Sequence, residues 1–228
     1  MAAPSASDTI IVVTGGDPVD PGELGHIPGG ALVIAADSGV ELAQALGLSI
    51  ARAIGDFDSV DPAALQAAEA AGAVVERHPE AKESTDLALA LDAALAHRPS
   101  RIHVVGGHGG RLDHLLANAL LLTSPAYAGV DLVAHVGPAR ITVIRAEAEL
   151  VGLPGDLVSL LAAEGVARGV TTDGLLYPLT GEDLHPGSTR GVSNEMAAAH
   201  AVVRLDAGVL LAVQPGQAGT HYAQRNDR

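Results

Sequence analysis

The chain is predicted to be an α/β protein whose N-terminal part is built on a parallel sheet, followed by an all-β part. Through residue 135, short runs rich in β-branched residues alternate with Ala- and Leu-rich stretches of helical length, the pattern of βαβ units. Beyond Gly137-Pro138, helix-length patterns become scarce, and short strand-like runs are separated by Gly, Pro, Asp and Thr clusters. We therefore expect two domains, at residues 1–138 and 139–228.

The elements of the first part can be placed in chain order. Strands are predicted at 9–14, 31–36, 51–54, 73–76, 101–106 and 130–135. Helices are predicted between them at 39–47, 62–71, 86–97 and 112–123. Asp61 and Pro62 supply an N-cap and a first-turn proline for the second helix. Leu87, Leu91 and Leu95 recur at four-residue spacing and mark one face of the third helix.

The second part is expected to contain strands only. Strand-like runs lie at 141–145, 157–161, 201–205 and 208–213. The residues from Gln214 onward are predicted to form a polar tail.

Composition and charge exclude several classes of function. Thirteen Lys plus Arg against 27 Asp plus Glu give a net charge of −14, which repels phosphate backbones and anionic bilayers. We expect no nucleic-acid or membrane partner. The absence of cysteine excludes disulfides, thiolate metal sites and cysteine nucleophiles. With no apolar run of membrane-spanning length and no cationic segment followed by an apolar one at the start, a cytoplasmic protein is expected.

The aromatic content is only 2 %, against 48 % hydrophobic residues. The core must therefore be packed from Ala, Val, Leu and Ile, and stacking surfaces for a ring-shaped ligand are scarce.

Acidic residues follow several of the predicted strands. Ligands of an open parallel sheet bind beyond the carboxyl ends of its strands, so these positions are candidate site residues. The acid-bearing segments are Asp37-Ser38-Gly39, Gly55-Asp56-Phe57-Asp58-Ser59 and Gly106 to His114, and Asp86 opens the helix at 86–97. Carboxylates gathered at one sheet edge repel one another unless a cation neutralises them, and Mg²⁺ prefers oxygen ligands. These segments indicate a magnesium and polyphosphate site.

The glycines at 106–110 are suited to phosphate binding at the start of the helix at 112–123. Their backbone amides can approach phosphate oxygens where the helix dipole favours anions. Arg111 and Lys82 would add positive charge. No P-loop signature, dinucleotide fingerprint or lipase-type nucleophile elbow is present.

Structural explanations compete with these assignments. Ser84 is a candidate cap for the helix at 86–97, with Asp86 serving only its first-turn dipole, and a glycine cluster after a strand is often just a tight turn. His103, His108 and His114 raise the possibility of a transition-metal site but lack helical or finger-like ligand spacing. Asp56 and Asp58 are harder to explain structurally, because alternate residues of an extended segment point to the same side.

Along nearly its whole length the chain resembles the thiamine pyrophosphokinase family. Six motifs in sequence order carry the resemblance: Ala36-Asp37-Ser38-Gly39, Gly55 to Ser59, Lys82-Glu83-Ser84-Thr85-Asp86, Gly109 to His114, Gly174 to Leu179, and Gly187 to Glu195. The resemblance implies an N-terminal three-layer α/β catalytic domain and a C-terminal β-sandwich domain. It also implies a homodimer whose active sites combine the α/β domain of one subunit with the β-domain of the other.

The reaction implied by the resemblance is thiamine plus ATP giving thiamine diphosphate plus AMP. Such chemistry asks a protein mainly for alignment and charge stabilisation. The implied roles are Mg²⁺ ligation by Asp56, Asp58 and Asp86, with Asp113 as a further catalytic carboxylate. The residues expected to bind ATP are Asp37, Ser38, Lys82, Arg111, His114 and Asn118. Those expected to bind thiamine are Thr85, Ser193 and Asn194.

The sequence departs from the family pattern after the Ser193-Asn194 pair. An aromatic residue often lies close after this pair in the family, whereas Met196-Ala197-Ala198-Ala199 follows here. Two other functions share the same motifs and stay open at this point. One is a pyrophosphokinase acting on another alcohol, such as a hydroxymethyl-pterin, and the other is a non-catalytic protein that binds a nucleotide or thiamine diphosphate.

Overall fold

The computed structural model describes residues 8–19, 21–24, 27–79, 81 and 84–216. The chain divides into two compact units, unit 1 (Met1–Gly137) and unit 2 (Pro138–Arg228). Unit 1 is α/β with a parallel sheet and unit 2 is antiparallel β, which confirms the predicted fold class. Among the described residues no helix is long and apolar enough to cross a membrane.

The elements of unit 1 match the predicted ones closely. Its strands are β1 (Thr9–Thr14), β2 (Leu32–Ala36), β3 (Arg52–Gly55), β4 (Val74–Arg77), β5 (Arg101–Val105) and β6 (Asp131–Val136). Its helices are α1 (Gly39–Ala45), α2 (Pro62–Ala70), α3 (Asp86–Leu95) and α4 (Leu112–Leu121), with short 3-10 turns η2 (Pro21–Leu24) and η3 (Pro125–Tyr127). Each predicted helix ran one or two residues past the observed end, where terminal carbonyls bond in 3-10 fashion.

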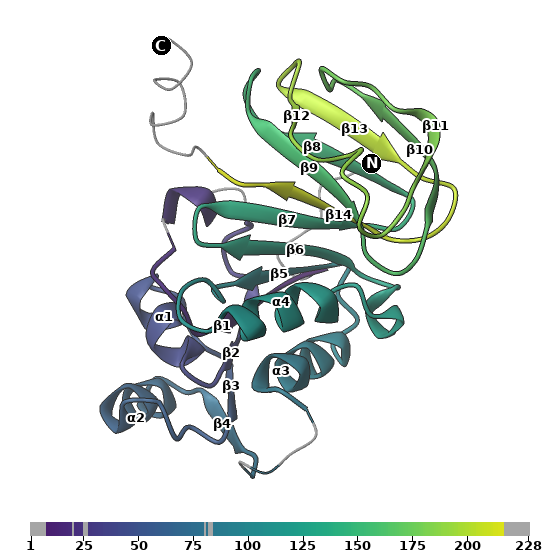
Figure 1. Cartoon of the computed structure of the whole chain (residues 1–228). Coiled ribbons are helices and arrows are strands. Elements are labelled where there is room, and N and C mark those ends of the chain that lie inside the picture. The colour runs from purple at the N-terminus through teal and green to yellow at the C-terminus, as the bar shows by residue number, and fades with distance from the viewer. Residues whose placement is uncertain (1–7, 20, 25–26, 80, 82–83, 217–228) are drawn as a thin grey trace. The chain divides into compact units, whose positions relative to one another are not determined.

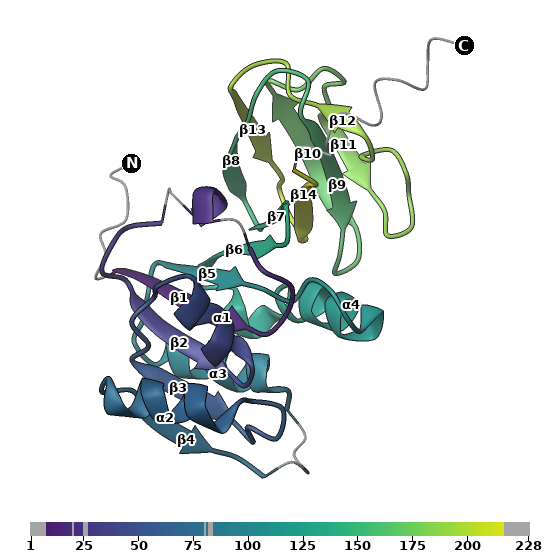
Figure 2. The ribbon, with the colours of Figure 1, turned by 90° about the vertical axis from the view of Figure 1, so that its left-hand side faces the viewer.

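The sheet of unit 1 has the order β6-β5-β1-β2-β3-β4, and all of these pairs are parallel. The chain runs from β2 to β4 toward one edge and from β5 to β6 toward the other. Right-handed crossovers therefore place α1 and α2 on one face of the sheet and α3 and α4 on the other (Figures 1 and 2). The direction reverses beside β1, which creates a crevice at the carboxyl ends of the central strands.

Two helices of unit 1 begin at side-chain caps. Asp61 accepts a hydrogen bond from the Ala63 amide at 2.9 Å and Pro62 occupies the first turn, so the predicted start of α2 is confirmed. In α3 the cap is Thr85, whose Oγ1 accepts from the Ala88 amide at 3.2 Å. Ser84, the candidate cap in the competing structural explanation, is not the cap, because Thr85 is the extended residue directly before the first helical turn.

Helix α4 differs from the other helices because none of its residues is buried. Leu112, Leu116 and Leu120 are 57–67 % exposed and recur every four residues, so they form one apolar stripe. A helix of this composition normally buries its apolar face. We call these three residues the α4 leucine stripe.

Unit 2 is a sandwich of two antiparallel sheets. Its strands are β7 (Ala139–Ile144), β8 (Glu147–Val151), β9 (Leu157–Ala162), β10 (Ala167–Asp173), β11 (Thr180–Leu184), β12 (Asn194–Glu195), β13 (His200–Arg204) and β14 (Leu210–Gln214). One sheet has the order β12-β9-β14-β7 and the other β11-β10-β13-β8. Buried Leu, Val and Ala side chains from both sheets form one core, including Leu160, Leu210, Val170 and Val203.

The sequence prediction for unit 2 was incomplete. It missed β8, β10, β11 and β12, because these strands show no clear apolar run. β8 and β11 bury one residue each, and β10 (ARGVTTD) mixes Gly and polar residues with its buried ones. Gln214 was predicted to begin a polar tail, but it is the last residue of β14 and is buried.

Candidate active site

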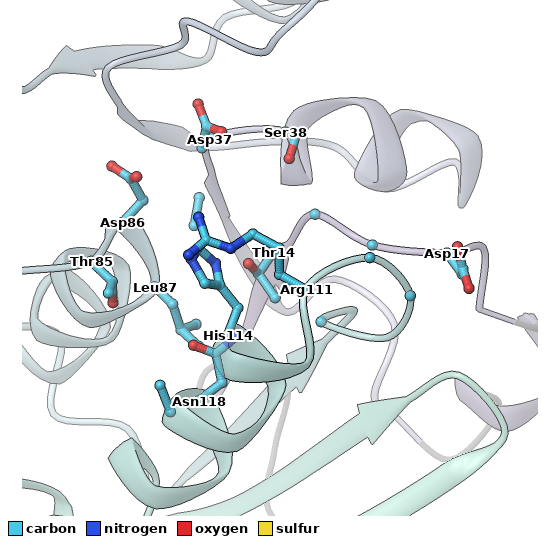
Figure 3. Close-up of a pocket in the computed structure, with 17 residues that line it drawn as sticks. Thr14, Asp17, Asp37, Ser38, Thr85, Asp86, Leu87, Arg111, His114 and Asn118 are labelled. Atoms are coloured by element: carbon cyan, nitrogen blue, oxygen red, sulfur yellow. The ribbon is translucent and has the colours of Figure 1, made fainter. Parts of the chain in front are cut away.

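A cavity of about 500 Å³ lies in unit 1 at the carboxyl ends of β1, β2 and β5. This is the point where the strand order reverses direction, which is where open parallel sheets bind ligands. The wall is formed by residues from five segments: Thr14, Gly15, Gly16, Asp17, Ala36, Asp37, Ser38, Thr85, Asp86, Leu87, Gly107, Gly109, Gly110, Arg111, His114, Ala117 and Asn118. Figure 3 shows the labelled side chains around this space.

Strand register brings the polar segments together. Thr14 pairs with Ala36, and Ala36 with Ile54, so β1, β2 and β3 end side by side. The next residue, Asp37, donates its backbone N–H to the Ile54 carbonyl at 2.9 Å. Gly106 is needed at the end of β5, because a Cβ there would lie 2.1 Å from the Thr14 carbonyl oxygen.

Three carboxylates gather beyond β2 and β3. Asp37, Asp56 and Asp58 each offer an oxygen within 4.8 Å of the others. The Asp37 carboxylate accepts hydrogen bonds from the Phe57 amide at 3.1 Å and the Ser59 hydroxyl at 2.8 Å, which orient it. We call Asp37, Asp56 and Asp58 the acid group.

The backbone around the acid group is strained. Asp37 and Phe57 have φ values of 47° and 60°, in the left-handed region that non-glycine residues rarely adopt. Such conformations persist only where the surrounding structure enforces them, and they cluster at functional sites. The donor set consists of carboxylate oxygens only and therefore fits a hard divalent cation such as Mg²⁺.

The acid group differs from the predicted metal ligands in one member. It contains Asp37, which the sequence analysis placed with the nucleotide, and it does not contain Asp86. Asp86 begins α3 and lines the cavity together with Thr85. Figure 3 shows Asp86 and Asp37 approaching the same end of the cavity from different elements. Asp37 belongs to both the acid group and the cavity wall, so the two features are continuous.

Positive charge enters the cavity from the start of α4. The side chains of Arg111 and His114 reach into the space in Figure 3, and Asn118 lies one turn further along the helix. Arg111 is the N-cap residue of α4, but its side chain makes no hydrogen bond to the helix. The first backbone amides of α4 therefore receive no side-chain acceptor from Arg111, and a helix N-terminus of this kind favours anions.

Arg111 is paired with Asp113 through its Nε at 3.2 Å and its Nη2 at 2.6 Å. This bidentate hydrogen bond and the attraction of the opposite charges raise the pKa of Arg111 and lower the pKa of Asp113. Asp113 was expected among the catalytic carboxylates, but it does not line the cavity and its side chain is 65 % exposed.

Two loops are hydrogen-bonded to each other beside the cavity. The Gly107 amide donates to the Gly15 carbonyl at 2.8 Å, and the Asp17 amide donates to the His108 carbonyl at 2.7 Å. The Asp17 carboxylate also lies 3.2 Å from His108 Nδ1. Sequence analysis missed the segment Gly15-Gly16-Asp17. The same rule that selected Asp37, an acid following a predicted strand, would have selected Asp17 after β1.

Three further predicted site residues are Lys82, Ser193 and Asn194. Lys82 lies outside the described residues. Ser193 and Asn194 belong to unit 2, where Asn194 is buried and Ser193 is exposed with a φ of 58°.

The three histidines considered as metal ligands do not gather. His103 Nδ1 lies 3.0 Å from His135 Nε2 in the interior, His108 faces Asp17, and His114 lines the cavity. In the part of the chain that the structure describes, the acid group is the single cluster of three or more His, Asp or Glu side chains that could hold a metal ion.

Two family models match successive parts of the chain. Residues 28–134 match "Thiamin pyrophosphokinase, catalytic domain", and residues 140–210 match "Thiamin pyrophosphokinase, vitamin B1 binding domain". A thiamine pyrophosphokinase from Bacillus subtilis is 28 % identical over 215 residues, which cover 90 % of this chain and 98 % of the relative.

Solved structures give the same result. The crystal structure of thiamine pyrophosphokinase from Bacillus subtilis superposes with a TM-score of 0.80 at 28 % identity, covering 91 % of this chain and 99 % of the other. That of thiamin pyrophosphokinase from Geobacillus thermodenitrificans superposes with a TM-score of 0.76 at 25 % identity, covering 92 % and 99 %.

Proposed function

Since the chain belongs to the thiamin pyrophosphokinase family, we propose that it transfers the diphosphoryl group of ATP to the hydroxyl oxygen of thiamine. The products are thiamine diphosphate and AMP. The single observation that carries the proposal is the cavity at the strand-order reversal, where the acid group and the cationic start of α4 lie along one space. The alternatives are not favoured, because the relatives that match along 90 % of the chain are thiamine pyrophosphokinases.

We propose Mg²⁺ as the divalent ion, held by Asp37, Asp56 and Asp58. When bound, it neutralises charge on the ATP phosphates and makes the β-phosphorus more electrophilic. The hydrogen bonds that Asp37 accepts from Phe57 and Ser59 fix its carboxylate, as partners of metal ligands commonly do.

The phosphates are proposed to lie along the glycine loop and the start of α4. Backbone amides of Gly109 and Gly110, together with the Arg111 and His114 side chains, supply donors to the phosphate oxygens. Arg111 would exchange its contact with Asp113 for phosphate oxygens when ATP binds, because both partners offer the same bidentate geometry.

The transfer itself needs alignment and one proton acceptor. The hydroxyl oxygen of thiamine attacks the β-phosphorus, the bond from that phosphorus to the α-phosphate oxygen breaks, and AMP leaves with the electron pair. We assign the role of accepting the hydroxyl proton to Asp86, because its carboxylate lines the cavity and its Oδ1 atom is buried.

We also propose that the active form is a homodimer, in which unit 1 of one subunit and unit 2 of the other form each active site. The α4 leucine stripe supports this proposal, since an exposed apolar stripe on a helix marks an interaction surface. Unit 2 likewise exposes Leu157 and Leu161 on one side of β9. A closed dimer would cover both surfaces in both subunits at once.

The proposed activity is tested by AMP release from the purified protein with ATP and Mg²⁺. Thiamine, a hydroxymethyl-pterin and no acceptor are compared, and product masses are measured. AMP formation that requires thiamine, with a product of the mass of thiamine diphosphate, is expected. AMP formed only with the pterin would replace the substrate and keep the chemistry. If a folded protein that binds ATP forms no AMP with any acceptor, the enzymatic proposal is wrong.

A further inference from the structure

Phe57 occupies an unusual position, because it separates two members of the acid group. It lies between Asp56 and Asp58 in the chain, and its φ of 60° is in the left-handed region that a bulky residue rarely adopts. A backbone of this kind costs free energy and persists only where neighbouring contacts enforce it. The contacts that hold Phe57 therefore also set the directions of the two carboxylates beside it.

The Phe57 side chain is anchored in a core of unit 1. It is 8 % exposed and belongs to a cluster of buried residues that includes Val40, Val60 and Leu65. Val40 lies in α1 and Leu65 in α2, so the ring packs with the helices that cover one face of the sheet. The Phe57 amide, in turn, donates to the Asp37 carboxylate at 3.1 Å. The main chain and the side chain of Phe57 are thus fixed by separate partners.

A further contact to the Phe57 ring comes from Arg77, the last residue of β4. The Cζ atom of its guanidinium lies over the ring, 5.3 Å from the ring centroid, which is within the range of a cation–π attraction. The other arginine at this edge of the sheet, Arg52 of β3, has a different partner, because its Nη1 atom pairs with the Glu76 carboxylate at 3.5 Å. Arg77 is thus the cation that covers the ring.

Strand pairing places Arg77 beside the segment that carries the acid group. The register of β3 and β4 pairs Gly55 with Arg77, and the next amide, that of His78, donates to the Gly55 carbonyl at 2.9 Å. Gly55 directly precedes Asp56, so β4 accompanies the chain up to the first carboxylate of the Asp56-Phe57-Asp58 segment. Because the sheet fixes the Arg77 backbone, only its side chain has to be ordered to reach the ring.

We propose that Arg77 is a positioning residue for the metal site. Its guanidinium holds the Phe57 ring against the core and so keeps the Asp56 and Asp58 carboxylates close to Asp37 before a metal ion binds. This inference rests on the proposed function, which assigns a divalent ion to the acid group. The free energy of gathering three carboxylates that repel one another is then supplied by folding, and metal binding no longer has to supply it. Arg77 acts through Phe57 and needs no contact with the ion.

The test distinguishes contact with the ring from positive charge at this edge of the sheet. Arg77→Met keeps a long apolar side chain and removes the cation, whereas Arg77→Lys keeps a cation that can lie over the ring. Arg52→Met is the matched control, because it removes the same charge from the neighbouring strand and leaves the contact between Arg77 and Phe57 in place.

Metal affinity is measured with Mn²⁺ in the absence of ATP and thiamine, because Mn²⁺ takes the same oxygen ligands as Mg²⁺ and free Mn²⁺ is quantified by electron paramagnetic resonance. We expect Arg77→Met to raise the Kd for Mn²⁺ about three- to fivefold, and Arg77→Lys and Arg52→Met to raise it less than about twofold. The Mg²⁺ concentration that gives half-maximal turnover should rise in the same order, with KM for thiamine unchanged. Equal effects of Arg77→Met and Arg52→Met would mean that only charge matters, and the positioning role would be wrong.

A double-variant cycle tests whether Arg77 acts through the ring. Phe57→Leu keeps an apolar anchor in the core but has no aromatic face for the guanidinium. Arg77→Met should therefore cause no further rise in the Kd for Mn²⁺ when it is combined with Phe57→Leu. The same rise in both backgrounds would show that Arg77 does not act through Phe57 and would overturn the proposal. If the Phe57→Leu protein does not fold, the comparison of Arg77→Met with Arg52→Met decides.

Mn²⁺ binding and product formation together separate failure of this inference from failure of the proposed function. If the wild type makes thiamine diphosphate and Arg77→Met binds Mn²⁺ as tightly as the wild type, the positioning role is wrong and the function stands. If the wild type makes no thiamine diphosphate but Arg77→Met binds Mn²⁺ more weakly, the activity fails and the positioning role is supported. If Asp58→Asn binds Mn²⁺ as tightly as the wild type, the acid group does not hold the ion, and this inference is overturned with it.

Discussion

Asp37 shows how single residues build this site. Its left-handed backbone turns the chain away from β2, and its carboxylate then accepts hydrogen bonds from Phe57 and Ser59 of the next strand–loop segment. These contacts bring Asp56 and Asp58 to the same place. Three carboxylates so close together repel one another, so part of the folding free energy is spent on a site that a cation would relieve.

Removing one carboxylate of the acid group should lower activity without lowering stability. We expect Asp58→Asn to reduce kcat at limiting Mg²⁺ at least about tenfold, because one metal ligand is lost. Without Mg²⁺, its thermal midpoint should equal or exceed that of the wild type, because one repulsive charge is gone. Turnover and differential scanning calorimetry, each with and without Mg²⁺, check this.

Glu69→Gln is the control for this change. It removes the same charge from an exposed position on α2 and should leave both quantities unchanged. Wild-type turnover of Asp58→Asn at limiting Mg²⁺ would remove Asp58 from the metal site.

At the scale of elements, the site depends on how closely α1 approaches the end of β1. A Cβ on Gly39 would lie 2.1 Å from the Val13 carbonyl oxygen, so the first residue of α1 touches the β1 backbone. This contact places Asp37 and Ser38, which directly precede α1, over the cavity. A larger residue at position 39 must push the helix away from the sheet.

Gly39→Ala should therefore weaken both stability and ATP binding. We expect a loss of unfolding free energy on the order of 2 kcal/mol, measured by urea denaturation, together with a higher KM for ATP. Gly29→Ala is the matched control, since a Cβ there meets no atom within 4 Å and should leave both quantities near the wild type. Equal stability of the two variants would show that α1 adjusts without moving the loop.

At the scale of the whole molecule, the chain consists of two units that have separate cores. The cavity and the acid group lie in unit 1, whereas Ser193 and Asn194, which the family resemblance assigns to thiamine, lie in unit 2. The α4 leucine stripe gives unit 1 an apolar surface of its own. A homodimer with shared active sites would use all of these features at once.

Shared active sites predict complementation between two inactive variants. Asp58→Asn damages unit 1, and Ser193→Arg places a bulky charge on the surface of unit 2. If the two variants are unfolded together and refolded as a mixture, half of the dimers are mixed, and each mixed dimer has one undamaged site. About a quarter of the wild-type activity should return.

Each variant refolded alone is the control for this mixture. No recovery in a mixture that light scattering shows to be dimeric would mean that each site is formed by a single subunit.

Much of this protein could be predicted from its sequence alone. The alternation of β-branched and Ala/Leu-rich segments placed every main element of unit 1, because buried parallel strands and amphipathic helices need those residues. The acids at positions 37, 56 and 58 were found because residues after parallel strands meet at one sheet edge, and Asp86 was found at the start of a predicted helix. Strands β8 and β11 were not found, because their few buried residues carry no periodic signal.

Other features were decided only by the tertiary structure. That Asp37 rather than Asp86 completes the acid group depends on strand register and on two left-handed residues, and neither is encoded in local spacing. The hydrogen bonds between the Asn194 side chain and the Tyr177 backbone join positions 17 residues apart through a buried amide, so they form only once β12 is in place. Local composition determines which elements form, whereas pairing between distant segments determines which side chains meet.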